Sequence, residues 1–196
     1  FSLTACGGGD ASTNDTAKEE GSSDVITVGF SQVGAESDWR TANSESMKST
    51  FTKDNGYELI FDDAQQKQEN QIPAIRNFIQ QDVDYIVLAP VTETGWDAVL
   101  GEAKQAGIPV IIVDRMVDVS DDSLYTAWVG SNFKLEGQKA MAWLDAYLEA
   151  KGRGDEEINL VDIQGTIGAS AQIGRTQGFD DAVEAHDNWT TLAQQS

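Results

Sequence analysis

The chain has 196 residues, of which 40% are hydrophobic and 23% charged, which is typical of one globular domain or parts of two. Its 33 acidic residues outnumber 13 basic ones and give a formal net charge of −20. Because a phosphate backbone and an anionic membrane surface would both repel this charge, the composition excludes nucleic-acid binding and favours a solvated acidic surface.

The N-terminal segment predicts a membrane anchor. Cys6 is the only cysteine, so neither an intramolecular disulfide nor a thiolate metal cluster can form. The small residues before it and the three glycines after it resemble a bacterial lipobox, in which the cysteine is lipid-modified, although a chance cysteine is the alternative. We therefore expect residues 1–5 to be a signal-peptide remnant, Cys6 to be lipidated and residues 6–24 to form a flexible polar tether.

From Val25 onward, short apolar runs alternate with amphipathic stretches of helical length, which predicts βαβ units and a parallel sheet. The expected strands are residues 25–30, 57–61, 85–88, 109–113 and 124–129. The expected helices are residues 39–55, 65–81 and 94–106, and the first and third end before a glycine. The sequence therefore predicts an α/β fold with Rossmann-like units and helices on both faces of each sheet.

A second series of elements begins after residues 129–132. It contains an expected helix at 133–151, a strand at 158–163, a helix at 171–185 and a short strand at 189–192. We expect residues 25–130 to form an N-terminal domain and residues 131–196 part of a second one, joined by a hinge at 129–132. The residues beyond Asn132 are too few for an equal partner, so we expect the second domain to be incomplete in this chain.

Polar residues follow several expected strands, at the sheet edge where parallel α/β folds bind ligands. Asp114 and Arg115 are the strongest candidates for ligand contact, because a carboxylate accepts from neighbouring hydroxyls and a guanidinium fork donates to them. Trp39 and Arg40 add an aromatic face and a second fork. A salt bridge or helix cap for the first pair, and a core position for Trp39, are the structural alternatives.

Several segments together resemble the periplasmic sugar-binding proteins of ABC transporters, and most closely their galactofuranose-binding branch. They are residues 28–34, 36–37, 39–40, 65–71, 89–91, 94–96, 108–110, 114–115, 164–166 and 168–170. The resemblance extends from Val25 to about Ala185 and implies a type I periplasmic-binding-protein fold, in which two hinged domains close over one sugar.

The resemblance also implies which residues contact the sugar. Ser37, Trp39 and Arg40 would do so from the first domain, Asp114 and Arg115 would clamp its hydroxyls, and Arg175 would reach it from the second. Asp38 replaces the family's usual glycine, so it either adds an acceptor or caps a helix. Phe30 and Thr166 are further expected contacts.

The expected function is therefore capture of a monosaccharide, galactofuranose or a related sugar, by a lipid-anchored, extracytoplasmic monomer that delivers it to an ABC transporter permease. Presentation of the sugar to a membrane receptor is the first alternative. A transcriptional regulator of the same fold is disfavoured, because the segment before the first strand is acidic where a basic DNA-binding motif would be needed.

We expect no catalytic residue, cofactor or metal. With one histidine and one cysteine the usual nucleophile and base pairs are missing, although a carboxylate-based glycosidase stays open. The glycine-rich turn at residues 165–170 lacks the lysine of a phosphate-binding loop, so hydroxyl or carboxylate contact is the better interpretation. His186 has no second His or Cys to share a metal, and we expect it to be solvated at a helix end.

Overall fold

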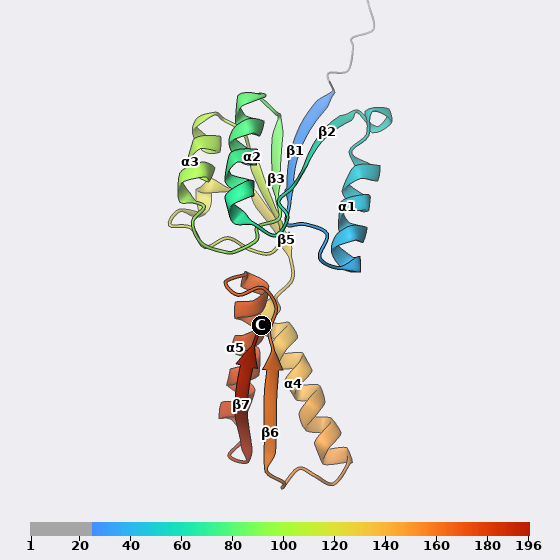
Figure 1. Cartoon of the computed structure of the whole chain (residues 1–196), viewed down its shortest axis with the longest axis vertical. Helices are drawn as coiled ribbons and strands as arrows, with labels where there is room; N and C mark the ends of the chain where they lie inside the picture. The colour runs from blue at the N-terminus through green and yellow to red at the C-terminus, as the bar shows by residue number, and fades with distance from the viewer. Residues whose placement is uncertain (1–24) are drawn as a thin grey trace, which may run out of the picture.

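The computed structural model describes residues 25–196, which form two α/β units stacked along the long axis of the molecule (Figure 1). The expected signal remnant, lipidation site Cys6 and tether lie outside these residues. The first unit is a five-stranded parallel sheet in the order β2-β1-β3-β4-β5. Its strands are β1 (Ile26–Gln32), β2 (Tyr57–Asp63), β3 (Tyr85–Leu88), β4 (Val110–Asp114) and β5 (Ala127–Gly130).

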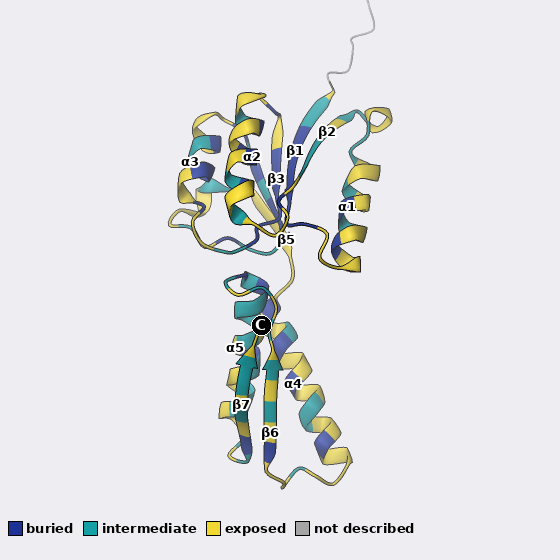
Figure 2. Ribbon diagram, in the orientation of Figure 1, coloured by how far each residue is buried: buried dark blue, intermediate teal, exposed yellow. Residues whose placement is uncertain are grey.

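Helices cover both faces of this sheet, as Figure 1 shows. On one face, α2 (Gln68–Gln80) and α3 (Asp97–Gln105) enclose a core that includes Ile75, Phe78 and Leu100. On the other face, α1 (Asp38–Thr50) contributes Met47 to a smaller core around Phe30. The α/β prediction is confirmed, and Figure 2 shows the buried residues concentrated in the inner strands.

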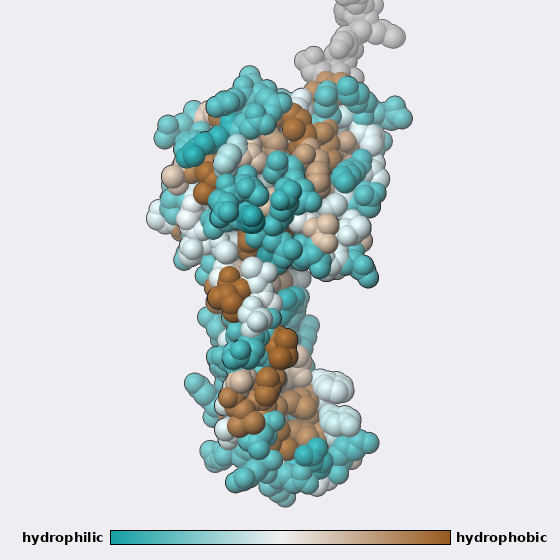
Figure 3. Space-filling model, viewed as in Figure 1, coloured by the Kyte–Doolittle hydropathy of each residue, from teal (hydrophilic) through white to brown (hydrophobic). Residues whose placement is uncertain are grey.

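The second unit packs two helices against one face of a small sheet. It contains α4 (Phe133–Ala150), β6 (Ile158–Ile163), α5 (Ser170–Glu184) and β7 (Trp189–Gln195), and β6 and β7 are parallel. Buried residues between sheet and helices include Met141, Leu148, Ile158 and Trp189. Apolar side chains on the other sheet face are exposed, and Figure 3 shows such side chains on the surface of this unit.

Three glycines allow α4 and α5 to pack at close range. A Cβ on Gly137 would lie 2.4 Å from the Arg175 carbonyl oxygen, and one on Gly178 would lie 2.5 Å from that of Lys134. A Cβ on Gly174 would lie 2.8 Å from the Cβ of Phe133. Because larger residues would force the helices apart, these glycines fix the position of α5 against the start of α4.

Several predicted boundaries are wrong because local backbone geometry overrides the periodic pattern. The helix expected at 39–55 ends at Thr50, and a separate 3₁₀ turn, Lys53–Asn55, follows. The helix expected from 65 begins at Gln68, because Gln65 and Gln66 adopt positive φ angles of 54° and 63°.

Two further boundaries differ for similar reasons. The helix expected from 94 begins at Asp97, after Gly95 with φ 89°. The strand expected from 124 begins at Ala127, because Asp122–Leu124 form a 3₁₀ turn whose capping Asp121 side chain accepts from the Ser123 N–H. In addition, β5 is exposed along its length rather than covered on both faces.

The chain passes from β5 to α4 at residues 131–132, within the expected hinge segment. Asn132 caps α4, since its side-chain oxygen accepts from the Leu135 N–H at 3.0 Å. The domain limits at 25–130 and 131–196 stay a prediction.

Gly29→Ala tests how tightly β1 packs under α2. A Cβ at this position would lie 2.5 Å from the ring of Phe78, which is 1% exposed. We expect a loss of about 1–3 kcal/mol of unfolding free energy in urea titrations followed by circular dichroism. The control is Gly101→Ala in α3, where nothing lies within 4 Å and a gain of about 0.5–1 kcal/mol is expected. Equal effects of the two changes would contradict this packing.

Asp62→Asn tests an electrostatic cost at the end of β2. Burial, with repulsion from Asp63, raises the pKa of Asp62, and its buried Oδ1 has no hydrogen-bond partner among the described residues. The stability that a raised carboxyl pKa contributes is present below the unfolded-state pKa and lost as pH rises through the folded-state value. The variant should therefore melt at a higher temperature than the parent at pH 7, and the difference should shrink on acidification. Asp155→Asn, in an exposed loop, is the control and should leave the melting temperature at pH 7 unchanged.

Candidate functional site

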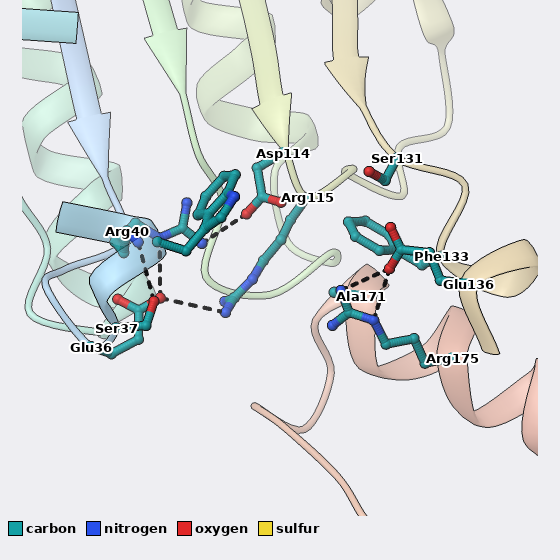
Figure 4. A pocket seen from close by; sticks show the side chains of 11 residues that line it. Glu36, Ser37, Arg40, Asp114, Arg115, Ser131, Phe133, Glu136, Ala171 and Arg175 are labelled. Carbon is teal, nitrogen blue, oxygen red and sulfur yellow. Dashed lines mark hydrogen bonds and ion pairs between the residues drawn. The ribbon is translucent and has the colours of Figure 1, made fainter. Parts of the chain in front are cut away.

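A cavity of about 340 Å³ lies between the two units (Figure 4). It is placed at the carboxyl ends of β4 and β5 and at the start of α1, α4 and α5, where backbone and side-chain donors converge. Its lining residues are Glu36, Ser37, Trp39, Arg40, Asp114, Arg115, Ser131, Phe133, Glu136, Ala171 and Arg175.

Arg40 is the buried centre of the first unit's contribution. Its side chain is only 3% exposed, and it donates from Nη2 to Asp114 Oδ2 at 2.7 Å and from Nε to Glu36 Oε1 at 3.1 Å. Its Nη1 atom is buried without a hydrogen-bond partner among the described residues. Since a buried guanidinium N–H without an acceptor is costly, the burial of Arg40 depends on its two carboxylate partners.

The start of α1 presents Trp39 to the cavity. Ser37 is the N-cap of α1, and its hydroxyl accepts from the Arg40 N–H at 3.2 Å. Trp39 is 57% exposed, and the Arg40 guanidinium lies 5.0 Å from its ring centroid. The alternative of a core position for Trp39 is therefore wrong, and its ring is available to a ligand.

Asp114 is held in an unusual backbone conformation at the end of β4. Its φ of 62° is in the left-handed region, and its carbonyl oxygen accepts from the Trp128 Nε1–H at 3.2 Å. A Cβ on Gly130 would lie 2.3 Å from the same carbonyl oxygen. The end of β5 therefore fixes the backbone from which the Asp114 carboxylate projects.

Arg115 extends into the cavity from the residue after Asp114. It donates from Nη1 to the Val91 carbonyl oxygen at 2.9 Å, and its Nη2 lies 3.9 Å from Glu36 Oε1. Burial, followed by repulsion from Arg40, lowers the pKa of Arg115 from its ordinary value. The side chain is 11% exposed, so it is positioned by the protein before any ligand arrives.

The second unit supplies Arg175 from α5. Its Nε and Nη2 atoms donate to Glu136 Oε2 at 3.0 and 2.8 Å, as Figure 4 shows. The guanidinium also lies over the Phe133 ring, 5.0 Å from its centroid. The two charged side chains therefore face the cavity as an ion pair.

Hydrogen bonds join the two units beside the cavity. The Glu93 N–H donates to the Gly168 carbonyl oxygen at 2.9 Å, and the Met116 N–H donates to Ser170 Oγ at 2.7 Å. The first bond links a loop of the first unit to the segment between β6 and α5, and the second links another loop to the first residue of α5. The cavity is thus bordered by residues from both units, which the chain connects at residues 131–132.

The cavity brings together six of the side chains expected to contact a ligand: Ser37, Trp39, Arg40, Asp114, Arg115 and Arg175. Three others lie elsewhere. Asp38 is exposed in the first turn of α1 and does not cap it, because Ser37 does. Phe30 is 0% exposed in the core, with its ring 5.6 Å from that of Phe61. Thr166 lines a neighbouring cavity of about 180 Å³ that shares Arg115 and Arg175 with the first.

The other lining residues were not predicted. Glu36 directly precedes the expected contact Ser37, and Ser131 is part of the expected hinge, so position alone would have suggested both. Phe133 and Glu136 are brought to Arg175 by the packing of α4 on α5, which no motif in the sequence indicates. Ala171 follows the glycine-rich turn, at the start of α5.

His186 follows the end of α5 as we expected, but it is only partly solvated, with a side chain that is 30% exposed. Its Nδ1 lies 2.7 Å from the Ala182 carbonyl oxygen, and its ring stacks on Trp189 at 4.0 Å between centroids. Within residues 25–196, no three His, Cys, Asp or Glu side chains are grouped to hold a metal ion. No helix in this part of the chain is long and apolar enough to cross a membrane.

Comparison with known proteins shows the family to which this chain belongs. A family model described as periplasmic binding protein domain matches residues 28–196. The galactofuranose-binding protein YtfQ of Escherichia coli (strain K12) is 47% identical over 171 residues, which are 87% of this chain and 52% of that protein. The chain thus spans about half the length of this relative.

Two solved structures are similar. One is a Mycobacterium smegmatis protein in complex with β-D-fucofuranose, which is 46% identical with a TM-score of 0.80 over 87% of this chain and 55% of that one. The other is the periplasmic binding protein component of the arabinose ABC transporter from Shewanella sp. ANA-3, bound to α- and β-L-arabinofuranose. It is 49% identical, with a TM-score of 0.78 over 87% of this chain and 54% of that chain.

Arg40→Met tests whether the ion pairs around Arg40 stabilise the fold. The change leaves Asp114 and Glu36, which are 17% and 20% exposed, without their main cation. We expect a loss of about 3 kcal/mol in urea unfolding. Arg76→Met is the matched control, because Arg76 pairs with Glu102 at 2.7 Å on the surface and should cost below about 1 kcal/mol. Similar losses in both variants would contradict a special role for Arg40.

Proposed function

Because the chain belongs to the periplasmic binding protein family, we propose that it captures a monosaccharide between its two units and delivers it to an ABC transporter permease. Galactofuranose or a related sugar is the proposed ligand. The observation that carries this proposal is the cavity between the units, where Asp114 and Arg115 of the first unit lie together with Arg175 of the second.

The chemistry of the cavity fits a small polyol. Carboxylates accept from hydroxyl groups and guanidinium groups donate to hydroxyl or ring oxygens, so Asp114, Arg40 and Arg115 together can read adjacent hydroxyls of one ring. The exposed indole of Trp39 offers a flat surface for the C–H face of that ring. The volume of about 340 Å³ lies within the range of small-ligand sites.

The relatives support a sugar in the furanose form. YtfQ is named as a galactofuranose-binding protein, and the two similar structures hold fucofuranose and arabinofuranose. Since the matched region includes Trp39, Arg40, Asp114, Arg115 and Arg175, we place the sugar against these residues.

The proposal extends to attachment and mechanism. We propose that Cys6 is lipidated, that the protein is an extracytoplasmic monomer, and that it binds its ligand without chemical change. The segment 129–132 would act as a hinge, because a sugar that contacts Asp114 on one side and Arg175 on the other favours a closed state over an open one. Presentation of the same closed form to a membrane receptor would use the same residues.

Calorimetry against a sugar panel tests the proposed function. The protein is expressed from its complete gene and titrated with D-galactose, D-fucose, L-arabinose, D-fructose and D-ribose, and the sugar is then recovered and checked for turnover. We expect saturable binding of at least one sugar, which is recovered unchanged. Absence of binding across the panel, or conversion of the sugar, would contradict the proposal.

Asp114→Asn should weaken binding of that sugar by about 1.5–3 kcal/mol, since it removes a charged acceptor from the cavity. Asparagine tolerates the φ of 62° at this position, so the backbone should be retained. Asp121→Asn, on the surface away from the cavity, is the control and should leave affinity unchanged. Equal affinities of the Asp114 variant and the parent, with the same melting temperature, would exclude Asp114 as a ligand contact.

A further inference from the structure

The cavity is lined by equal numbers of positive and negative side chains, and this equality holds within each unit. Three guanidinium groups line it, from Arg40, Arg115 and Arg175, and three carboxylates accompany them, from Glu36, Asp114 and Glu136. In the first unit, Glu36 lies within ion-pair distance of both Arg40 and Arg115, and Asp114 pairs with Arg40. In the second unit, Glu136 lies alone with Arg175, so the balance there depends on one carboxylate.

Arg175 is the most accessible of these cations. Its side chain is 55% exposed, compared with 3% for Arg40 and 11% for Arg115. Glu136 accepts both hydrogen bonds from Arg175 through one oxygen atom, at 2.8 and 3.0 Å. A ligand that enters the cavity from solvent therefore meets a guanidinium whose charge Glu136 already compensates.

The position of Glu136 relative to Arg175 is fixed by the fold. Glu136 lies in the first turn of α4, directly after the chain crossing, while Arg175 lies in the second turn of α5. The close approach of Gly137 to the Arg175 carbonyl and of Gly174 to Phe133 leaves little freedom between these turns. The packing of α4 on α5 thus holds the backbones of Glu136 and Arg175 close together.

The three cations also influence one another. Arg175 is close enough to Arg115 to add to the repulsion that, after burial and Arg40, lowers the pKa of Arg115. Without Glu136 the side of the cavity facing Arg115 would carry an excess positive charge. Such a charge in a partly desolvated site attracts an anionic ligand.

We propose that Glu136 is a specificity-determining residue, which compensates Arg175 so that the cavity accepts an uncharged sugar and rejects a sugar acid. This inference rests on the proposed sugar-binding function. An uncharged sugar can accept from the remaining Arg175 N–H groups without disturbing the pair. The carboxylate of a uronate must either displace Glu136 from Arg175 or lie beside its negative charge, and both are unfavourable.

The test compares a neutral sugar with its uronate in Glu136→Gln. The first pair compared is D-galactose and D-galacturonate, which differ only at C6. If another sugar of the panel binds more tightly, that sugar and its own uronate are compared as well. We expect the affinity for the uronate relative to the neutral sugar to rise about tenfold in the variant, as one uncompensated cation gains a charged partner. The gain should fall as salt is added.

Two control variants separate charge from structure. Glu136→Asp retains the carboxylate and should restore the parent's preference. Glu102→Gln breaks a comparable ion pair, with Arg76, on the surface of the first unit and should leave the preference unchanged. If Glu136→Gln alters the melting temperature more than Glu102→Gln does, the double variant E136Q/R175Q decides. It removes both charges, so the preference should return to that of the parent.

The outcomes distinguish this inference from the function on which it rests. If the unsubstituted protein binds no neutral sugar, the proposed function fails and the inference fails with it. If the protein binds a neutral sugar and E136Q changes the uronate-to-sugar ratio by less than about twofold, only the role of Glu136 is overturned. A gain that persists in E136Q/R175Q would also overturn it, because Arg175 could not then be its source.

Discussion

Burial of the Arg40 guanidinium is the constraint on which the site depends. A cation that is 3% exposed requires acceptors within hydrogen-bond distance, and these come from two places in the chain, Glu36 before α1 and Asp114 after β4. The loop that follows β1 and the end of β4 are therefore held together by this one side chain. The third nitrogen of the guanidinium, Nη1, is buried without a hydrogen-bond partner among residues 25–196, so the two carboxylates carry the compensation for this buried cation.

Buried glutamine side chains hold the loops around the cavity in place. Gln71 on α2 donates to the Ala89 carbonyl oxygen at 2.7 Å and accepts from the Val91 N–H at 2.9 Å, so it fixes the loop after β3. The Val91 carbonyl in turn accepts from Arg115. Gln32 similarly donates to Asn43 on α1 at 2.8 Å. The loops around the cavity are thus ordered by fully buried polar side chains rather than by apolar packing alone.

The sequence was informative where a rule connects the residue to its place in the fold. Asp114 and Arg115 could be placed at the site because parallel strands direct their carboxyl ends to one edge, and this rule needs only the strand assignment. Glu136 could not be found in this way, because its partner Arg175 is 39 residues away and meets it only through the packing of α4 on α5. The positive φ of Asp114 was equally hidden, since it depends on Trp128 and Gly130 in a neighbouring strand. Phe30 was misplaced because alternation in a strand turns its side chain into the core, although the strand itself points to the site.

The positions of the tryptophans determine what the intrinsic fluorescence of this protein can report. Trp39 borders the cavity, and the indole of Trp128 is bonded to the carbonyl of Asp114 beside the chain crossing. Trp96 and Trp189 are 0% and 6% exposed in the two cores, away from the cavity. Indole emission depends on local polarity and on the hydrogen bond of the ring nitrogen. Of the five tryptophans, one therefore borders the cavity, one is hydrogen-bonded to the backbone of Asp114, two lie in the cores, and Trp143 is exposed on α4, so substitution of Trp143 would leave intrinsic fluorescence that reports mainly on the cavity.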